Sequence, residues 1–418
     1  MRIAIIGGGV SGLTAGYRLY EQFDITLFEA NNYIGGHTNT INVPTDIGNV
    51  AVDTGFIVFN NRTYPNFIAL LTELSVPFQE TRMTFSVSCD QTGLEYSGTG
   101  LNGIFAQRKN ILRPWFYRLL LDFVRFRKDA ERLLESDQPQ ESVGDFFKRR
   151  NYSQQFVEQY FLPMGAAIWS SSFETFQDFP IQFIAEFYKN HGLLGIRDRP
   201  QWYVVKGGSN QYVAPLTRDW NDRIKLSSPI ESVAREGSLV LVKPAGCEAQ
   251  VFDHVIFACH SDQALKILGE AATATERELL SAFPYQKNHA ILHTDASVLP
   301  KNRRAWSCWN YYRPKQKNES ATLTYNMNML QSLQTDETYC VTLNDTGRID
   351  PGKIIRTIDY AHPTFSVNRK SMQARHTELL GANNTSYCGA YWANGFHEDG
   401  IRSALAVVKQ LQESRDER

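Results

Sequence analysis

The sequence lacks the signatures of several large protein classes. Its six cysteines include no Cys-x-x-Cys pair and no Cys/His group at the spacing of zinc ligands, so we expect reduced thiols and no metal site. It has no run of about 18 apolar residues that could span a membrane, and its apolar start is too short for a signal peptide. The net charge of -1 gives no general attraction to nucleic acids. We therefore expect a cytoplasmic protein with no nucleic-acid partner.

The N-terminal segment carries the clearest motif. An apolar run from Ile3 to Ile6 is followed by Gly7, Gly9 and Gly12, an amphipathic stretch, and a second apolar run that ends at Glu29. This order is typical of a strand–turn–helix–strand unit that binds the pyrophosphate of a dinucleotide at a helix N-terminus. The acid at the end of the second strand accepts ribose hydroxyls in that unit. The predicted nucleotide contacts are Gly7, Gly9, Val10, Ser11, Gly12, Glu29 and Ala30.

Further motifs indicate which dinucleotide is bound. A second glycine pair, Gly35-Gly36, precedes the stretch from Val52 to Phe56, and related elements follow at 203–216, 253–259 and 387–408. In this order the motifs resemble those of the flavin-containing amine oxidase superfamily, which includes monoamine oxidases and phytoene desaturases. The words GGHT, LTYNMNMLQSL, His362-Pro363 and GFHEDG are similar to a bacterial branch of predicted NAD/FAD-binding proteins associated with modified fatty-acid synthesis.

The resemblance implies an α/β fold in which two domains are interleaved. A chain of 418 residues exceeds the size at which single cores stop growing, about 250–300 residues, which agrees with two domains. We expect a Rossmann-like FAD-binding domain from 1–77, 203–274 and 377–418, and an α+β substrate domain from 78–202 and 275–376. The first insertion should be mostly helical, and antiparallel strands of the second should form a floor against the flavin.

The resemblance also assigns cofactor contacts beyond the N-terminal motif. The N–H groups near Gly400 and Ile401 should face the flavin region that becomes negative on reduction. The further predicted contacts are Gly35, Gly36, His37, Thr38, Gly55, Phe56, Ile57, Ile230, Gly389, Asp399, Gly400 and Ile401.

Three positions depart from the superfamily pattern. His37 replaces an arginine, so we expect a group that titrates near neutrality and FAD affinity that weakens as pH rises. Gly389-Ala390 lacks the usual carboxylate before the last helix, which predicts weaker hold on the ribityl chain. Cys388 falls in a strand beside the pyrophosphate rather than under the flavin ring, so we expect non-covalent FAD.

Catalysis in this superfamily requires mainly alignment of a substrate C–H bond over the flavin. The candidate catalytic side chains are His397, Glu398 and Tyr312. A purely structural reading is open for each, because Glu398 and Asp399 could cap the last helix while His397 packs. No second glycine fingerprint marks a nicotinamide site, so O2 or another electron acceptor is expected to reoxidise the flavin.

The substrate is the least determined feature. Phenylalanines between Phe173 and Tyr188 could line a tunnel for a fatty-acyl chain, which favours a lipid desaturase or oxidase. Eight Arg and Lys with interleaved aromatics in 108–132 could contact the inner membrane face peripherally, or could be a solvated face over a buried aromatic one. An amine or amino-acid oxidase, with Tyr391 and Trp392 caging the substrate nitrogen, and a non-catalytic lipid-binding protein of the same fold are the alternatives.

Overall fold

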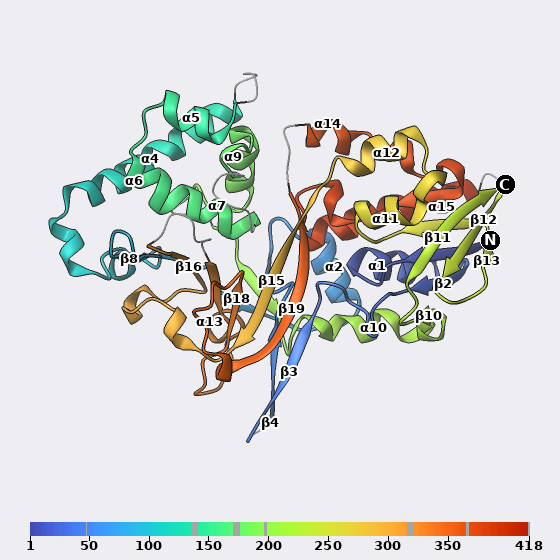
Figure 1. Cartoon of the computed structure of the whole chain (residues 1–418), viewed down its shortest axis with the longest axis horizontal. Coiled ribbons are helices and arrows are strands. Elements are labelled where there is room, and N and C mark those ends of the chain that lie inside the picture. The colour runs from blue at the N-terminus through green and yellow to red at the C-terminus, as the bar shows by residue number, and fades with distance from the viewer. Residues whose placement is uncertain are drawn as a thin grey trace.

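The structure is a computed structural model that describes residues 1–46, 48–135, 141–169, 176–195, 199–315, 322–364 and 368–416. Both ends of the described chain lie near a five-stranded parallel sheet in the right half of Figure 1. Its strand order is β10-β2-β1-β14-β20. The bounds are β1 (Arg2–Ile6), β2 (Asp24–Phe28), β10 (Ile224–Lys225), β14 (His254–Phe257) and β20 (Thr385–Tyr387).

The N-terminal strand is apolar from Ile3 to Ile6 because it is covered on both sides. Ile3 and Ile5 belong to a core with α1, α2, α10 and α15, whereas Ala4 and Ile6 belong to a core with α11, α12 and a small antiparallel sheet, β11-β12-β13. This is the pattern of a doubly wound sheet, in which alternate side chains enter opposite cores. The bounds are α1 (Val10–Leu19), α2 (Pro65–Glu73), α10 (Val213–Thr217), α11 (Ser261–Leu268), α12 (Ala274–Ser281), α15 (His397–Asp416), β11 (Ile230–Glu236), β12 (Leu239–Pro244) and β13 (Gln250–Phe252).

A seven-stranded sheet forms the middle of the molecule (Figure 1), with the order β19-β15-β18-β17-β16-β7-β8. All its pairs are antiparallel except β16 with β7. The antiparallel strands expected from the second insertion are therefore present, and the first insertion adds two strands to their sheet. Their position against the flavin stays a prediction. The bounds are β7 (Phe85–Cys89), β8 (Leu94–Ser97), β15 (Tyr285–His293), β16 (Trp309–Arg313), β17 (Thr322–Asn326), β18 (Cys340–Leu343) and β19 (Ile354–Pro363).

Helices from the first insertion gather beyond this sheet, at the upper left of Figure 1. Their inner faces contribute most of an aromatic core that includes Phe116, Phe126 and Phe161. The expectation of a mostly helical insertion was wrong at its start, because residues 78–97 form strands that complete neighbouring sheets. The helix bounds are α3 (Leu101–Ile104), α4 (Pro114–Leu134), α5 (Val143–Arg149), α6 (Gln154–Phe156), α7 (Leu162–Trp169) and α9 (Ile181–Asn190).

Smaller elements join the two halves. The hairpin β3-β4 extends from the lower edge of the molecule (Figure 1), and β5, β9 and β6 form a three-stranded sheet. No helix of the described residues is both long and apolar enough to cross a membrane. The proposed domain boundaries remain a prediction. The remaining bounds are β3 (Thr40–Thr45), β4 (Gly48–Asp53), β5 (Phe59–Asn60), β6 (Phe78–Thr81), β9 (Trp202–Val205), α13 (Met327–Gln331) and α14 (Arg369–Ala374).

Candidate active site

The glycine turn between β1 and α1 is built by contacts that exclude side chains. Gly7 has a φ of +112°, and a Cβ placed on it would lie 2.9 Å from the backbone of Ala258. A Cβ on Gly12 would lie 1.9 Å from the Gly7 oxygen, so strand and helix touch there. A Cβ on Gly9, in contrast, would meet nothing within 4 Å. The turn therefore offers open space at Gly9, in front of the first N–H groups of α1, which lack partners within the helix.

Glu29 and the second glycine pair close around this turn. One carboxylate oxygen of Glu29 accepts a 2.7 Å hydrogen bond from the Gly8 N–H, and the other accepts from the backbone and side chain of Asn31. The Gly35 N–H donates to the Gly8 oxygen at 2.7 Å, and a Cβ on Gly36 would lie 3.1 Å from the Gly9 Cα. Glu29 lines the cavity and has further lone pairs for a ligand, so its ribose contact stays a prediction.

We call the glycine turn from Gly7 to Ser11, with Glu29 and Gly35-Gly36 around it, the cradle. One cavity of about 2760 Å³ runs from this cradle into the rest of the molecule. Most of the predicted cofactor residues line it, and they come from loops that follow the parallel strands and from the segment after β4. Gly12 and Thr38 do not line it and lie one layer behind. The predicted residues in the wall are Gly7, Gly9, Val10, Ser11, Glu29, Ala30, Gly35, Gly36, His37, Gly55, Phe56, Ile57, Ile230, Gly389 and His397.

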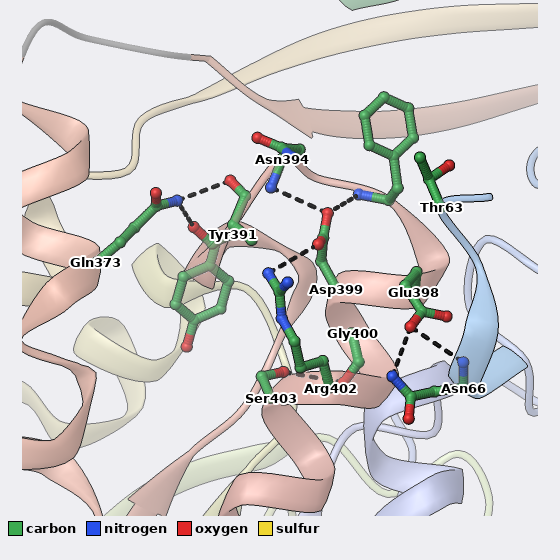
Figure 2. Close-up of polar contacts among 12 residues, drawn as sticks. Thr63, Asn66, Gln373, Tyr391, Asn394, Glu398, Asp399, Gly400, Arg402 and Ser403 are labelled. Carbon is green, nitrogen blue, oxygen red and sulfur yellow. Dashed lines mark hydrogen bonds and ion pairs between the residues drawn. The ribbon is translucent and has the colours of Figure 1, made fainter. Parts of the chain in front are cut away.

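The start of α15 corrects four predicted roles (Figure 2). The Asp399 carboxylate accepts from the N–H groups of Asn394 and Phe396 and pairs with Arg402, so it fixes the loop before its own helix. The Gly400 N–H donates to the Phe396 oxygen, and a Cβ on Gly400 would lie 2.8 Å from the Ser11 Oγ. Neither residue lines the cavity. The predicted flavin contacts of Asp399 and Gly400 were wrong, because Asp399 holds the loop before α15 and Gly400 packs against α1.

Ile401 and Glu398 are also structural. Ile401 is buried in the core between α15 and the parallel sheet and does not line the cavity. The Glu398 carboxylate accepts from the backbone and side chain of Asn66 and from the Phe67 N–H, at the N-terminus of α2 (Figure 2). This carboxylate therefore caps a neighbouring helix on the side away from the cavity, and its predicted catalytic role was wrong.

His397 lies in the cavity wall and is held from two directions. Its Nε2 lies 2.9 Å from the Thr38 Oγ1 and 3.0 Å from the Tyr212 hydroxyl. Its ring stacks on Phe56 with 3.6 Å between centroids and 8° between planes. Burial, and then His37, lower the pKa of His397 to about 3. The imidazole is therefore neutral at physiological pH and supports Phe56 from behind.

Three further imidazoles and a tyrosine surround the mouth of the cradle. His37 stacks on Tyr360 at 5.0 Å, and its ring centroid lies 5.3 Å from that of His362 and 6.1 Å from that of His260. Burial and then His260 lower the pKa of His37 to about 4. This lowered pKa differs from the expectation that His37 titrates near neutrality, because the ring is packed among other imidazoles.

Tyr312 lies away from the cavity. Its hydroxyl donates to Asp90 at 2.7 Å, and the Arg348 guanidinium lies over its ring. It is absent from the cavity wall in the described residues, whereas Trp309 and Tyr325 are present. The predicted catalytic role of Tyr312 was wrong, because side chains alternate along β16 and this one points to the other face.

The far part of the cavity is apolar and enters the helical region. Its wall there comes from α3, α4 and the π-helical turn and helix that follow α6. We call this part the apolar arm; its wall is formed by Ile104, Leu119, Leu120, Phe123, Val124, Tyr160, Met164 and Ile168. The phenylalanine-rich segment contributes less than expected: Phe187 lines the cavity, Phe176, Phe179 and Phe183 pack in the core, and Phe173 lies outside the described residues.

The pair proposed as an amine cage does not form one in the described residues. Tyr391 lines the cavity, but Trp392 stacks on His376 at 4.2 Å and packs against Phe283 instead. The sequence reasoning also missed His260, Tyr360 and Tyr212. His260 follows a buried parallel strand at the edge that binds ligands, so its position was a usable signal; the other two had none.

Comparisons with known proteins agree on the fold. A family model described as flavin containing amine oxidoreductase matches residues 10–412. No curated protein matches the chain. Cyclohexylamine oxidase from Brevibacterium oxydans is 14% identical with a TM-score of 0.69, over 98% of this chain and 99% of that one. Putrescine oxidase is 13% identical with a TM-score of 0.69, over 99% of each. A fatty acid isomerase from P. acnes is 15% identical with a TM-score of 0.65, over 98% of each.

Proposed function

Since the chain belongs to the flavin-containing amine oxidoreductase family, it is an FAD-dependent oxidoreductase, and we propose that its substrate is a lipid with a fatty-acyl chain. FAD supplies a hydride acceptor when bound. The substrate loses a hydride and a proton, and O2 or another acceptor finally takes the two electrons. The enzyme is then a desaturase or an oxidase of acyl chains.

The cradle fits FAD by two observations. A side chain on Gly9 would enter open space, which leaves the backbone there free for a pyrophosphate, and the buried Nε2 of His37 has no hydrogen-bond partner. Gly7, Gly9, Val10, Ser11 and Gly36 would hold the phosphates, and Glu29 the adenosine ribose. We propose that the cofactor is held without a covalent bond, because Cys388 is fully buried behind the cradle.

The single observation that carries the lipid proposal is the apolar arm. The whole cavity exceeds the roughly 300–1,000 Å³ of typical small-ligand pockets, so room remains beyond a dinucleotide. Aliphatic and aromatic side chains of the arm bury an acyl chain, at about 0.8 kcal/mol for each CH₂ removed from water. A small amine would leave most of the apolar arm unfilled.

The chain's own residues would position the acyl chain and exclude water. His397 is a weak base, because its pKa is about 3 in the free protein. We therefore assign it a positioning role: it supports Phe56, which lines the cavity next to the glycine pair. Phe187, His191 and Phe396 pack together in the same wall and would close the site from the side of α9.

The proposal includes supply of the substrate from a membrane. The enzyme would be cytoplasmic and would contact the inner membrane face peripherally through 108–132. An amine or amino-acid oxidase and a lipid-binding protein without catalysis are the competing functions.

Anaerobic mixing with candidate substrates tests the substrate class. The purified holoprotein is expected to lose its flavin absorbance with unsaturated or methyl-branched phospholipid in detergent, and to keep it with primary amines. Bleaching by amines with the lipids inert would assign the protein to amine oxidation. A protein that takes up no FAD but copurifies with lipid would be a binding protein.

A further inference from the structure

An unusual concentration of exposed apolar side chains lies beside the apolar arm. Of the fourteen large apolar side chains that are exposed in the described residues, six lie between Leu101 and Val124. Leu112 is 85% exposed, Leu101 76% and Leu121 66%. Scattered exposed leucines are ordinary, but six such side chains within one segment of 24 residues indicate a surface that another phase or molecule covers. The group is Leu101, Ile111, Leu112, Tyr117, Leu121 and Val124.

The exposed group is a second apolar face of α4 and not an edge of the core. Tyr117, Leu121 and Val124 follow one another at spacings of four and three, so they share one side of the helix. The core of the helical region takes the opposite side, through Phe116 and Phe126. The short turn η1 (Arg108–Leu112) lies against this side of α4, because the Tyr117 hydroxyl donates to the Ile111 oxygen at 2.8 Å. The helix α3 precedes η1 in the chain.

The charge around this face is positive. Residues 101–128 contain seven Arg and Lys and one acid, Asp122. The Asp122 side chain is 3% exposed and pairs with Arg118 and Arg125, so it presents little negative charge to solvent. Lys109 shortly precedes Ile111, Lys128 follows Val124 by four residues, and both are exposed. Apolar side chains ringed by cations suit the interface of an anionic bilayer, where the former enter the acyl region and the latter meet headgroups.

The same segment is also a wall of the cavity. Ile104 and Leu120 line the apolar arm from α3 and α4, and Gly98, Thr99 and Gly100 line it just before α3. Val124 lines the cavity while 48% of its side chain is exposed. The arm therefore reaches the surface where the exposed apolar group lies.

We propose that residues 101–128 form a docking face for an anionic lipid bilayer, and that an acyl chain passes from the bilayer through this face into the apolar arm. This statement rests on the proposed function and deepens it by naming the surface and the lipid charge. Only passage of the acyl chain also requires the lipid substrate; binding to the bilayer does not. Charge complementarity and continuity with the arm select a lipid surface over a second copy of this chain or another protein.

Sedimentation with vesicles tests the docking face. The holoprotein is mixed with vesicles of phosphatidylcholine alone and of phosphatidylcholine with one third phosphatidylglycerol. We expect binding to the anionic vesicles that weakens with salt, and little to the neutral ones. Lys109→Glu/Lys128→Glu should weaken binding at least about tenfold, since each removed charge alone is worth about fivefold. Leu112→Ser/Leu121→Ser should also weaken binding at least about tenfold, because two apolar side chains no longer enter the acyl region. None of the four residues lines the cavity.

A matched control removes two other exposed leucines at the opposite end of the molecule. Leu226 and Leu239 are 44% and 40% exposed and lie beside the parallel sheet, so Leu226→Ser/Leu239→Ser should bind vesicles like the parent. All variants should keep their FAD content and their bleaching by detergent-solubilised lipid.

Three results would overturn or separate the two proposals. Equal vesicle binding by the parent and Leu112→Ser/Leu121→Ser would refute the docking face. A dimer in light scattering that this variant dissolves, with no vesicle binding by the parent, would make the face an interface between two copies and refute the bilayer. Vesicle binding as expected, with no bleaching by lipid in detergent, would support docking and refute the lipid substrate.

Discussion

The cradle in the parallel-sheet half and the apolar arm in the helical region are built by opposite means. At the cradle the backbone itself forms the surface, because a Cβ on Gly12 would lie 1.9 Å from the Gly7 oxygen and only Gly9 has room in front of it. In the apolar arm the surface is made of replaceable side chains such as Ile104, Leu120 and Met164. A site made of backbone tolerates few changes and can be read from a sequence, whereas a site made of side chains can change its ligand with the fold intact.

The largest effect is expected where the backbone forms the site. Gly9→Val places a branched side chain in the open space of the cradle, so FAD content should fall to less than about a tenth while the fold persists. Flavin absorbance per protein and far-ultraviolet circular dichroism measure the two effects. Gly352→Val is the matched control, since Gly352 lies away from the cavity and has no positive φ. Normal flavin content in Gly9→Val would show that the glycine turn does not hold the cofactor.

A substitution in the apolar arm is expected to leave FAD bound and to block the substrate. Ile104→Trp fills the apolar arm, and even a methylene-sized misfit in an apolar pocket costs about 10–200-fold in specificity. The rate of flavin bleaching by long-chain lipid should therefore fall by at least about tenfold at unchanged FAD content. Ile355→Trp lies outside both the cavity wall and the docking face, 38% exposed, and should react like the parent. Unchanged bleaching in Ile104→Trp would place the acyl chain elsewhere.

Acid is expected to destabilise the parallel-sheet half more than the helical region. Burial is the main cause that lowers the pKa of His37 and His260 to about 4 and of His362 and His397 to about 3. An unfolded chain protonates histidine near about 6.5, so below this pH the unfolded state binds more protons and the free energy of unfolding falls until about pH 4. The loss is of order 1 kcal/mol or more for each buried histidine. Among the described residues of the helical region, His191 alone has its pKa lowered in this way.

Thermal unfolding of the FAD-free protein between pH 7 and 4.5 measures this loss. The parent should lose stability steeply as the pH falls, and His37→Gln/His362→Gln should lose less. Because phosphates favour the imidazolium form, added FAD should flatten the parent's dependence. Identical slopes in parent and variant would assign the acid sensitivity to other groups.

The smallest effect is expected at Glu398. Its carboxylate accepts three hydrogen bonds at the N-terminus of α2, and losing such a cap costs about 1 kcal/mol. Glu398→Ala should lower the melting temperature slightly and leave the pH profile of flavin bleaching unchanged. Glu413→Ala, at an exposed position of the same helix, should change neither. A displaced pH profile in Glu398→Ala would restore a catalytic role to this residue.

Features set by the local backbone could be predicted from the sequence, and contacts formed only by the tertiary fold could not. The turn from Ile6 to Gly12 and the acid Glu29 are local features whose chemistry is set within a few residues, and the structure places them together. Gly400 looked like a free N–H donor because it stands near a helix start, but the helix begins at His397 and the N–H already has a partner. His260 and Tyr360 meet His37 only through the tertiary fold, so local patterns could not join them.

The order of strands in the parallel sheet bears on how the protein is made. The Arg2 N–H donates to the Asp253 carboxylate, 251 residues along the chain, and β14 in turn pairs with β20 near residue 386. Ribosomes add about 5–20 residues per second, so β1 waits roughly 13–50 s for β14, and β14 waits further for β20. During translation the exposed edge of β1 is open to wrong pairing. Cofactor capture is thereby a late event of biogenesis, and cells that produce this enzyme quickly should benefit from chaperones that shield the nascent N-terminal strand.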